Sequence, residues 1–302
     1  MTFIVDCGEH SFKVGELTKN GSLIGPKVFR VPRVFGESLV DLGFWETFLG
    51  YTKGDSFVVS LPISSLRRSR EELCRFLFET LEASAVSILS STHLATLAAG
   101  LETALVVDIG QAGTRVTCVE DGYPLPHCSA FGGVGGAELT SKMSLLEPKA
   151  DAERLKEDVA SVAEEKNSKD SKDSKFRCGE VLFDASGTEI SASETLPELV
   201  MTSLRLQSNI NLRGKLLEHV LVIGGTSKMN GLQRRLRKEL LLRSKWIAPG
   251  HALESTKIEC CGPHAAWNGA ALLAQCPIFK ELLMSRKQYE ASGPQIVHQN
   301  FF

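Results

Sequence analysis

The chain has 302 residues, of which 43% are hydrophobic and 23% are charged, and its formal net charge is −2 at pH 7. This length predicts about two domains of ~150 residues each, with one elaborated domain as the alternative. The charge balance gives no bulk signal for nucleic acid, and no apolar run reaches the roughly 20 residues that span a bilayer.

The start of the chain, "MTFIVDCGEH", lacks the features of a signal peptide, and the eight cysteines contain no CxxC pair. Both observations suit free thiols in a reducing compartment, so we expect a cytoplasmic protein.

Two β-rich runs, "TFIVDCG" and "SFKVGEL", surround a turn and predict a hairpin. The same strand, Asp-x-Gly turn and strand unit recurs, so that residues 5–17 and residues 105–119 form an internal duplication. A strand and then a helix over about residues 69–81 follow the first copy, and a further strand and helix run up to Gly100. This alternation predicts an α/β fold.

The composition changes after the second copy. Residues 150–166 predict an amphipathic helix, and a flexible loop is expected over about residues 164–175, where "NSKDSKDSK" contains no apolar residue. Helices over residues 196–206 and 231–242 flank the strand "HVLVIGG".

An aspartate and a glycine at the end of a strand are typical of hairpins that hold phosphate. Glycine lets backbone N–H groups approach phosphate oxygens, and the carboxylate can hold hydrated Mg²⁺. Asp6 and Gly8 end the first such strand, Asp108 and Gly110 end the second, and "IGGTS" ends a third. One such turn is weak evidence, whereas two copies in a duplicated frame are stronger.

At this point the chain resembles the actin superfamily, and in particular the actin-related proteins. The stretches that carry the resemblance are "ALVVDIG" with "VTCVEDGYPLPH", "KFRCGEVLF", "IGGTSKMNGLQRRLRKEL", and "WNGAALLA" with "SRKQYEASGPQIVH". The last pair is the most specific, because sugar kinases and Hsp70-type chaperones share the hairpins and lack that end.

The resemblance implies an α/β, actin-like fold, a duplicated ribonuclease H-like fold with two large domains and strongly reduced small subdomains. Domain I would comprise residues 1–100 and 265–302, and domain II residues 101–264. It also implies a degenerate nucleotide site formed by Asp6, Gly8, Lys13, Asp108, Gly110, Gly224, Gly225 and Thr226.

Several departures from the family weaken that site. Glu9 and His10 replace the serine and glycine that would donate to the terminal phosphate, and Ser91 falls where the water-orienting glutamine would be. In the second hairpin the departures are Gln111, Ala112 and Arg115. We therefore expect no enzyme, no catalytic residue, no resident metal and no required cofactor, with a structurally bound ATP or ADP with Mg²⁺ as the open alternative.

The small subdomains are short. Only about thirty residues separate "KVGEL" from "FWETFLGY", where actins carry a whole subdomain, and residues 140–175 are also reduced. Filament growth needs two different faces on each subunit, so a molecule that lacks one face can cap an end. This geometry resembles the actin-related subunits of the dynactin pointed-end complex, called ten in fungi and eleven in animals.

That resemblance implies a cytoplasmic, cytoskeletal protein in dynein-driven microtubule transport. Its partners would be a filament-forming actin-related protein or actin and other pointed-end subunits, with no direct contact to nucleic acid or membrane. Partner contacts are expected in residues 278–289, at Ile278, Leu282 and Tyr289.

Three alternatives stay open. One is a nuclear actin-related subunit of a chromatin-remodelling complex, and another is an orphan actin-like protein of the cytoskeleton or axoneme. The third, less favoured, is an ATPase or sugar kinase. The basic run over residues 234–245 is interpreted as a solvated helix face rather than a nucleic-acid patch, because it has no interleaved aromatic residues.

Overall fold

The computed structural model describes residues 1–30, 45, 54–165, 173–184, 186, 191–243, 247–248, 255–299 and 301. The chain divides into two compact units. Unit 1 comprises Met1–Gly100 and His264–Phe302, and unit 2 comprises Leu101–Pro263. No helix within these described ranges is long and apolar enough to cross a membrane.

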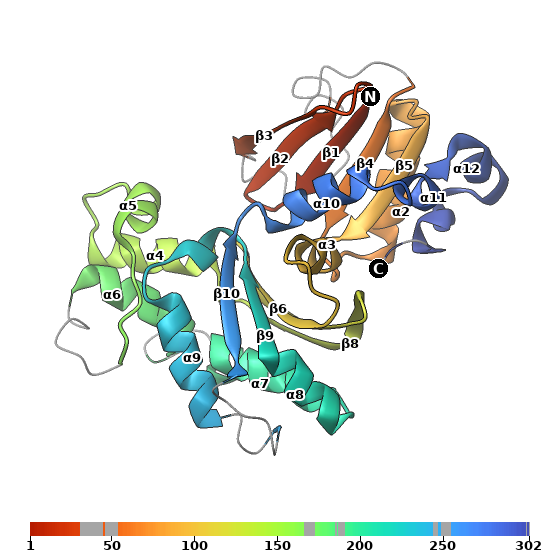
Figure 1. The fold of residues 1–302 in the computed structure, drawn as a ribbon. Coiled ribbons are helices and arrows are strands. Elements are labelled where there is room, and N and C mark those ends of the chain that lie inside the picture. Colours follow the sequence, from red (N-terminus) through yellow and green to blue (C-terminus); the bar gives the residue numbers. More distant parts are fainter. Residues whose placement is uncertain are drawn as a thin grey trace. The chain divides into compact units, whose positions relative to one another are not determined.

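Unit 1 is built on a six-stranded mixed sheet with the order β11-β5-β4-β1-β2-β3 (Figure 1). Its strands are β1 (Thr2–Cys7), β2 (Ser11–Leu17), β3 (Leu23–Arg30), β4 (Ser56–Leu61), β5 (Ala85–Ser90) and β11 (Met284–Ser285). Its helices are α2 (Arg67–Arg75), the π-turn η2 (Phe76–Thr80), α3 (Ser91–Ala98), α10 (Ala265–Gln275), α11 (Phe279–Leu282), α12 (Arg286–Ser292) and η9 (Pro294–Gln299).

Unit 2 is built on a five-stranded mixed sheet with the order β10-β9-β6-β7-β8. Its strands are β6 (Ala104–Ile109), β7 (Thr114–Glu120), β8 (Tyr123–Gly132), β9 (His219–Ile223) and β10 (Lys257–Gly262). Its helices are α4 (Gly136–Leu146), α5 (Ala152–Val159), α6 (Ser174–Gly179), η4 (Glu180–Leu182), η5 (Ala192–Glu194), α7 (Leu196–Leu206), α8 (Ile210–Glu218), η6 (Gly225–Lys228) and α9 (Leu232–Arg243).

The two sheets share one topology, which confirms the internal duplication. In unit 1, β3, β2 and β1 form an antiparallel meander, and β4 and β5 continue the sheet in parallel with β1. In unit 2, β8, β7 and β6 form the same meander, and β9 and β10 continue in parallel with β6. Side chains of β1, β4 and β6 are buried almost throughout, as expected for strands covered on both faces.

Helix α10 packs very closely on α3 in unit 1. A Cβ atom added at Gly269 would lie 1.8 Å from the Leu94 carbonyl oxygen, so only glycine permits this approach. The neighbouring Trp267 is buried, and its Nε1 donates a hydrogen bond to the Ile4 carbonyl at 3.2 Å. The stretch "WNGAALLA" thus fixes α10 against both the sheet and α3.

The helix expected over residues 69–81 forms, but with a change of geometry. The α-helix α2 ends at Arg75, and the π-turn η2 follows, with the Leu81 N–H donating to the Phe76 carbonyl at 3.0 Å. Leu73, Leu77 and Leu81 are all buried. The wider turn therefore keeps the apolar side chains on the core side.

The helix expected over residues 150–166 is shorter in the structure, because tertiary hydrogen bonds replace its last turns. Helix α5 ends at Val159, and the N–H groups of Ser161 and Val162 donate to carbonyls of Lys175 and Asn230. The loop expected over residues 164–175 is shorter at both of its ends. Glu164 and Glu165 form ion pairs with Lys238, and α6 already begins at Ser174; residues 166–172 lie outside the described chain.

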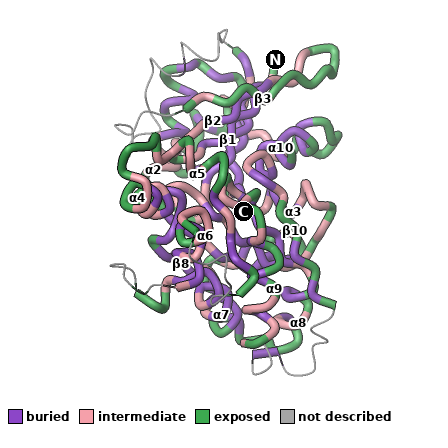
Figure 2. Tube along the Cα trace, turned by 90° about the vertical axis from the view of Figure 1, so that its left-hand side faces the viewer, coloured by how far each residue is buried: buried purple, intermediate pink, exposed green. Residues whose placement is uncertain are grey.

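Strand β3 forms one edge of the unit 1 sheet and is exposed over most of its length (Figure 2). β3 ends at Arg30 and β4 begins at Ser56, so 25 residues stand where the reduced subdomain is expected. Apart from residues 45, 54 and 55, these lie outside the described chain.

Candidate functional site

The first hairpin places Lys13 and Asp6 directly opposite each other on β2 and β1. Lys13 Nζ donates to Asp6 Oδ2 at 3.0 Å, and Ser60 Oγ, from the neighbouring strand β4, donates to Asp6 Oδ1 at 2.8 Å. Asp6 is 7% exposed and Lys13 is 8% exposed. Each carboxylate oxygen of Asp6 therefore already accepts a hydrogen bond from a side chain of unit 1.

The turn between β1 and β2 closes on itself. The Gly8 N–H donates to the Ser11 carbonyl at 3.2 Å, and a Cβ atom on Gly8 would lie 2.8 Å from that same oxygen. Glu9 is exposed at the tip and His10 is half-buried. The turn itself thus requires Gly8, whether or not a phosphate is bound.

The second hairpin is held by the start of α4. The Gly110 N–H donates to the Gly113 carbonyl at 2.9 Å, which closes the turn between β6 and β7. The N–H groups of Gly136 and Ala137 donate to the carbonyls of Gly110 and Gln111, both at 2.8 Å. Two of the N–H groups at this helix N-terminus, which could otherwise bind an anion, are therefore used within unit 2.

Gly224 brings the end of β9 against the end of β6. Its φ of 90° lies in the left-handed region, and a Cβ atom there would lie 2.4 Å from the Ile109 carbonyl and 3.0 Å from Asp108 Oδ1. The Ser227 N–H and Oγ both donate to the Gly224 carbonyl, at 3.3 and 2.7 Å. This network positions Gly225 and Thr226 in the turn η6.

The structure thus gathers the expected nucleotide residues into two groups, one in each unit. In unit 1 these are Asp6, Gly8 and Lys13, and in unit 2 they are Asp108, Gly110, Gly224, Gly225 and Thr226. In the unit 1 group, each oxygen of the Asp6 carboxylate accepts one hydrogen bond, from the Lys13 ammonium and from the Ser60 hydroxyl. Ser60 was missed by the sequence analysis; its only sequence signal is a polar residue inside the apolar run "SFVVSL".

The three expected partner contacts differ in exposure. Ile278 is 58% exposed, whereas Leu282 is half-buried and packs against the cluster of Trp267 and Phe279. Tyr289 is the least accessible of the three. It is 7% exposed, its ring stacks on Phe78 at 4.5 Å between centroids, and its hydroxyl donates to Glu79 at 2.6 Å, so it belongs to the core.

Taken together, these observations define a duplicated α/β protein in which each copy of the fold begins with an Asp-x-Gly hairpin. The chain belongs to the actin family, whose sequence profile, described as Actin, matches residues 38–152 and 164–302. A known relative is Actin-related protein 7 of Arabidopsis thaliana, which is 26% identical over 287 residues, covering 85% of this chain and 78% of the relative.

Proposed function

We propose that this protein is a non-catalytic actin-related protein that serves as a structural subunit of a cytoskeletal complex. The observation that carries the proposal is the state of Asp6, whose two oxygens accept hydrogen bonds from Lys13 and Ser60 in a buried environment. The family resemblance assigns that lysine to phosphate and that aspartate to Mg²⁺. Here they neutralise each other inside unit 1.

The composition of the first turn supports the same proposal. Glu9 stands at the exposed tip, where a carboxylate repels a terminal phosphate. Ser91 stands where the resemblance places the glutamine that orients the attacking water. Its side chain is too short to take that role. Any ATP or ADP that binds would then act as a structural ligand that stabilises the fold by mass action.

The assembly we propose is the dynactin pointed-end complex, in support of dynein-driven microtubule transport in the cytoplasm. The proposal rests on the short chain between β3 and β4 and on the resemblance stated above. A subunit with one reduced face can join a filament end and stop its growth, because a head-to-tail contact needs two complementary faces. Its partners would be a filament-forming actin-related protein or actin and other subunits at that end.

The proposal is tested by affinity purification of the tagged protein from native cells, followed by mass spectrometry of its partners. Dynactin subunits and the filament-forming actin-related protein are the expected result. Helicase-type remodeller subunits would instead assign the protein to a nuclear complex, and the absence of both would favour an orphan actin-like protein.

The non-catalytic part is tested separately on the purified protein. Nucleotide is released by denaturation and identified by chromatography, and phosphate release from added MgATP is followed under native conditions. We expect no turnover above buffer, with or without bound nucleotide. Steady turnover that disappears in Asp108→Asn would overturn this part of the proposal.

The partner face is tested at Ile278. Ile278→Asp places a charge on a side chain that is 58% exposed, so it should block incorporation without lowering the melting temperature. Leu66→Asp is the matched control, because Leu66 is 71% exposed in the same unit. Incorporation of Ile278→Asp at the control level would refute this surface.

A further inference from the structure

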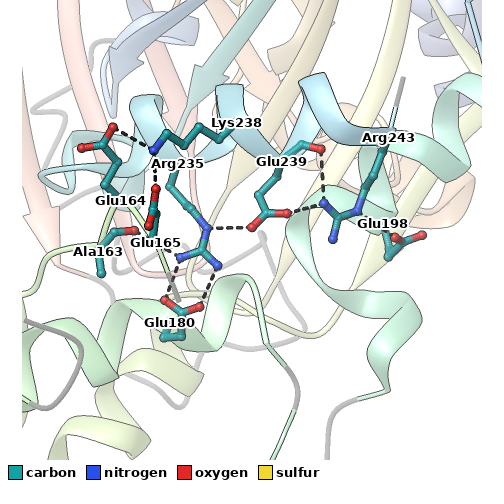
Figure 3. Close-up of polar contacts among 9 residues, drawn as sticks. All are labelled: Ala163, Glu164, Glu165, Glu180, Glu198, Arg235, Lys238, Glu239 and Arg243. Carbon is teal, nitrogen blue, oxygen red and sulfur yellow. Dashed lines mark hydrogen bonds and ion pairs between the residues drawn. The ribbon is translucent and has the colours of Figure 1, made fainter. Parts of the chain in front are cut away.

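Helix α9 carries a run of basic residues, and the structure divides them into two groups. The first group faces carboxylates of unit 2 (Figure 3). The guanidinium of Arg235, whose side chain is 4% exposed, donates to both oxygens of Glu180 at 2.8 and 3.0 Å and to Glu239 at 2.7 Å. Lys238 contacts Glu164 and Glu165, and Arg243 contacts Glu198 and Glu239. These cations are neutralised within the fold.

The second group lines a groove between α9 and β10. Arg234 and Arg237 are exposed on α9, and with Lys257 of β10 they line an open groove of about 420 Å³. The rest of the lining is Gln233, Ile258 and Glu259. Gln233 Nε2 donates to the Ile258 carbonyl, which fixes the helix against the strand. The groove therefore holds three cations and one carboxylate.

The groove lies at an edge of the unit 2 sheet. Strand β10 pairs with β9 on one side only within the described chain, and α9 runs beside it (Figure 1). Among the described residues, neither Arg234 nor Lys257 forms an ion pair, in contrast to Arg235 and Lys238 of the same helix. Arg234 and Lys257 thus leave positive charge exposed between a helix and a strand edge, where a ligand of opposite charge can reach it.

We propose that this groove binds a short acidic segment of a partner protein. Carboxylates of such a segment can form bidentate hydrogen bonds with the guanidinium groups of Arg234 and Arg237 and an ion pair with Lys257. Ile258 and the aliphatic parts of the arginine side chains supply apolar contact beneath them. A nucleic acid fits less well, because no aromatic side chain lines the groove to stack on a base.

This inference goes beyond the proposed function, because it involves neither the hairpins nor residues 278–289 and holds for either kind of complex.

The test uses the full chain and a fluorescein-labelled synthetic peptide rich in glutamate, with a central leucine. Its control peptide carries glutamine at each glutamate. Binding is followed by fluorescence polarisation at low salt and at about 0.15 M salt, where charges further apart than ~8 Å are screened.

Two matched double variants locate the site. The double variant Arg234→Glu with Lys257→Glu reverses the charge of two residues that line the groove. The double variant Lys149→Glu with Lys215→Glu makes the same change of charge at exposed positions elsewhere in unit 2. Arg234→Gln with Lys257→Gln removes the charge without reversing it, and melting temperatures establish that each variant is folded.

We expect the acidic peptide to bind, the groove-reversed variant to bind about tenfold more weakly or worse, and the distant variant to stay within about twofold of the parent. The neutral variant should lie between them. Equal loss in both reversed variants would mean a general charge effect and would overturn the proposal, as would equal binding of the glutamine peptide. Tighter binding of duplex DNA than of the peptide, lost in the groove variant, would replace the proposal with a nucleic-acid site.

Discussion

The ammonium nitrogen of Lys13 lies 3.0 Å from Asp6 Oδ2, between facing residues of the β1–β2 hairpin, and both residues are buried. The same two residues are those that the family resemblance assigns to phosphate and Mg²⁺. Lys13 and Asp6 form a buried ion pair of the sheet, and the Ser60 hydroxyl donates to the other Asp6 oxygen. Such a pair persists because removing only one partner leaves an uncompensated charge in the interior.

This pair predicts an asymmetry between single and double replacement. Lys13→Met leaves the Asp6 carboxylate buried without its cation and should lower the free energy of unfolding by about 3–5 kcal/mol. Lys13→Met combined with Asp6→Asn removes both charges and should cost clearly less. Urea unfolding monitored by circular dichroism measures both values. A double variant that is as unstable as the single one would show that the pair is not the source of the loss.

A second prediction concerns Arg235 and Glu180, which join α9 to η4 through two hydrogen bonds. A double-mutant cycle with alanine at each position should give a coupling energy of about 1–3 kcal/mol, because the guanidinium is desolvated and bidentate. The comparison is Arg68 and Glu72, which are 2.8 Å apart with side chains 87% and 41% exposed. That exposed pair should give no more than about 0.5 kcal/mol. Similar values for both pairs would contradict this account.

A third prediction concerns the titration of Tyr289. Burial, and then the hydrogen bond to the Glu79 carboxylate, raise the pKa of Tyr289 from 10.0 to about 12. The folded state favours the neutral phenol, so its contribution to stability is complete below pH 10 and is lost as the pH rises from 10 to about 12. Tyrosinate absorbance should therefore include a late step from Tyr289.

The variants Tyr289→Phe and Tyr123→Phe separate this step from the others. Tyr289→Phe should remove the late step and flatten the loss of stability in that range. Tyr123→Phe, at a side chain that is 58% exposed, is the matched control for the substitution itself. A late step that survives in Tyr289→Phe would assign it to another group.

A fourth prediction concerns thiol reactivity. Cys7, Cys74, Cys118, Cys128 and Cys178 are buried, whereas Cys260 and Cys276 are exposed and Cys261 is half-buried. Burial also raises the pKa of Cys74 and Cys118 to about 12 and that of Cys178 to about 11, so these thiols hold little reactive thiolate.

Ellman's reagent should therefore modify three of the eight thiols in the native protein and all eight after unfolding. Cys276→Ser is the control and should reduce the native count by one. Rapid modification of a fourth thiol under native conditions would mean that one unit opens more easily than its burial implies.

Much of the fold could be predicted from local pattern. The two hairpins repeat the same spacing of aspartate and glycine, and α7 and α9 follow the apolar periodicity of "LPELVMTSLRL" and "LQRRLRKELLLR". The predicted end of a helix was wrong where tertiary hydrogen bonds override that periodicity. Helix α5 ends early because the backbone after Val159 forms hydrogen bonds with residues 175 and 230. The local sequence contains no pattern that predicts these long-range bonds.

In the candidate site, too, local contacts could be predicted from the sequence and distant contacts could not. The sequence alone determined that Asp6, Gly8 and Lys13 share one hairpin and that Asp108 and Gly110 share its copy, because a tight turn fixes the register of the two strands it joins. Contacts between distant parts of the chain place Ser60, 54 residues from Asp6, beside that carboxylate, and they bury Tyr289. They also turn α9 so that Arg235 is buried and Arg234 is exposed. These outcomes depend on which strand lies beside which and how each helix is turned, and contacts distant in sequence set both.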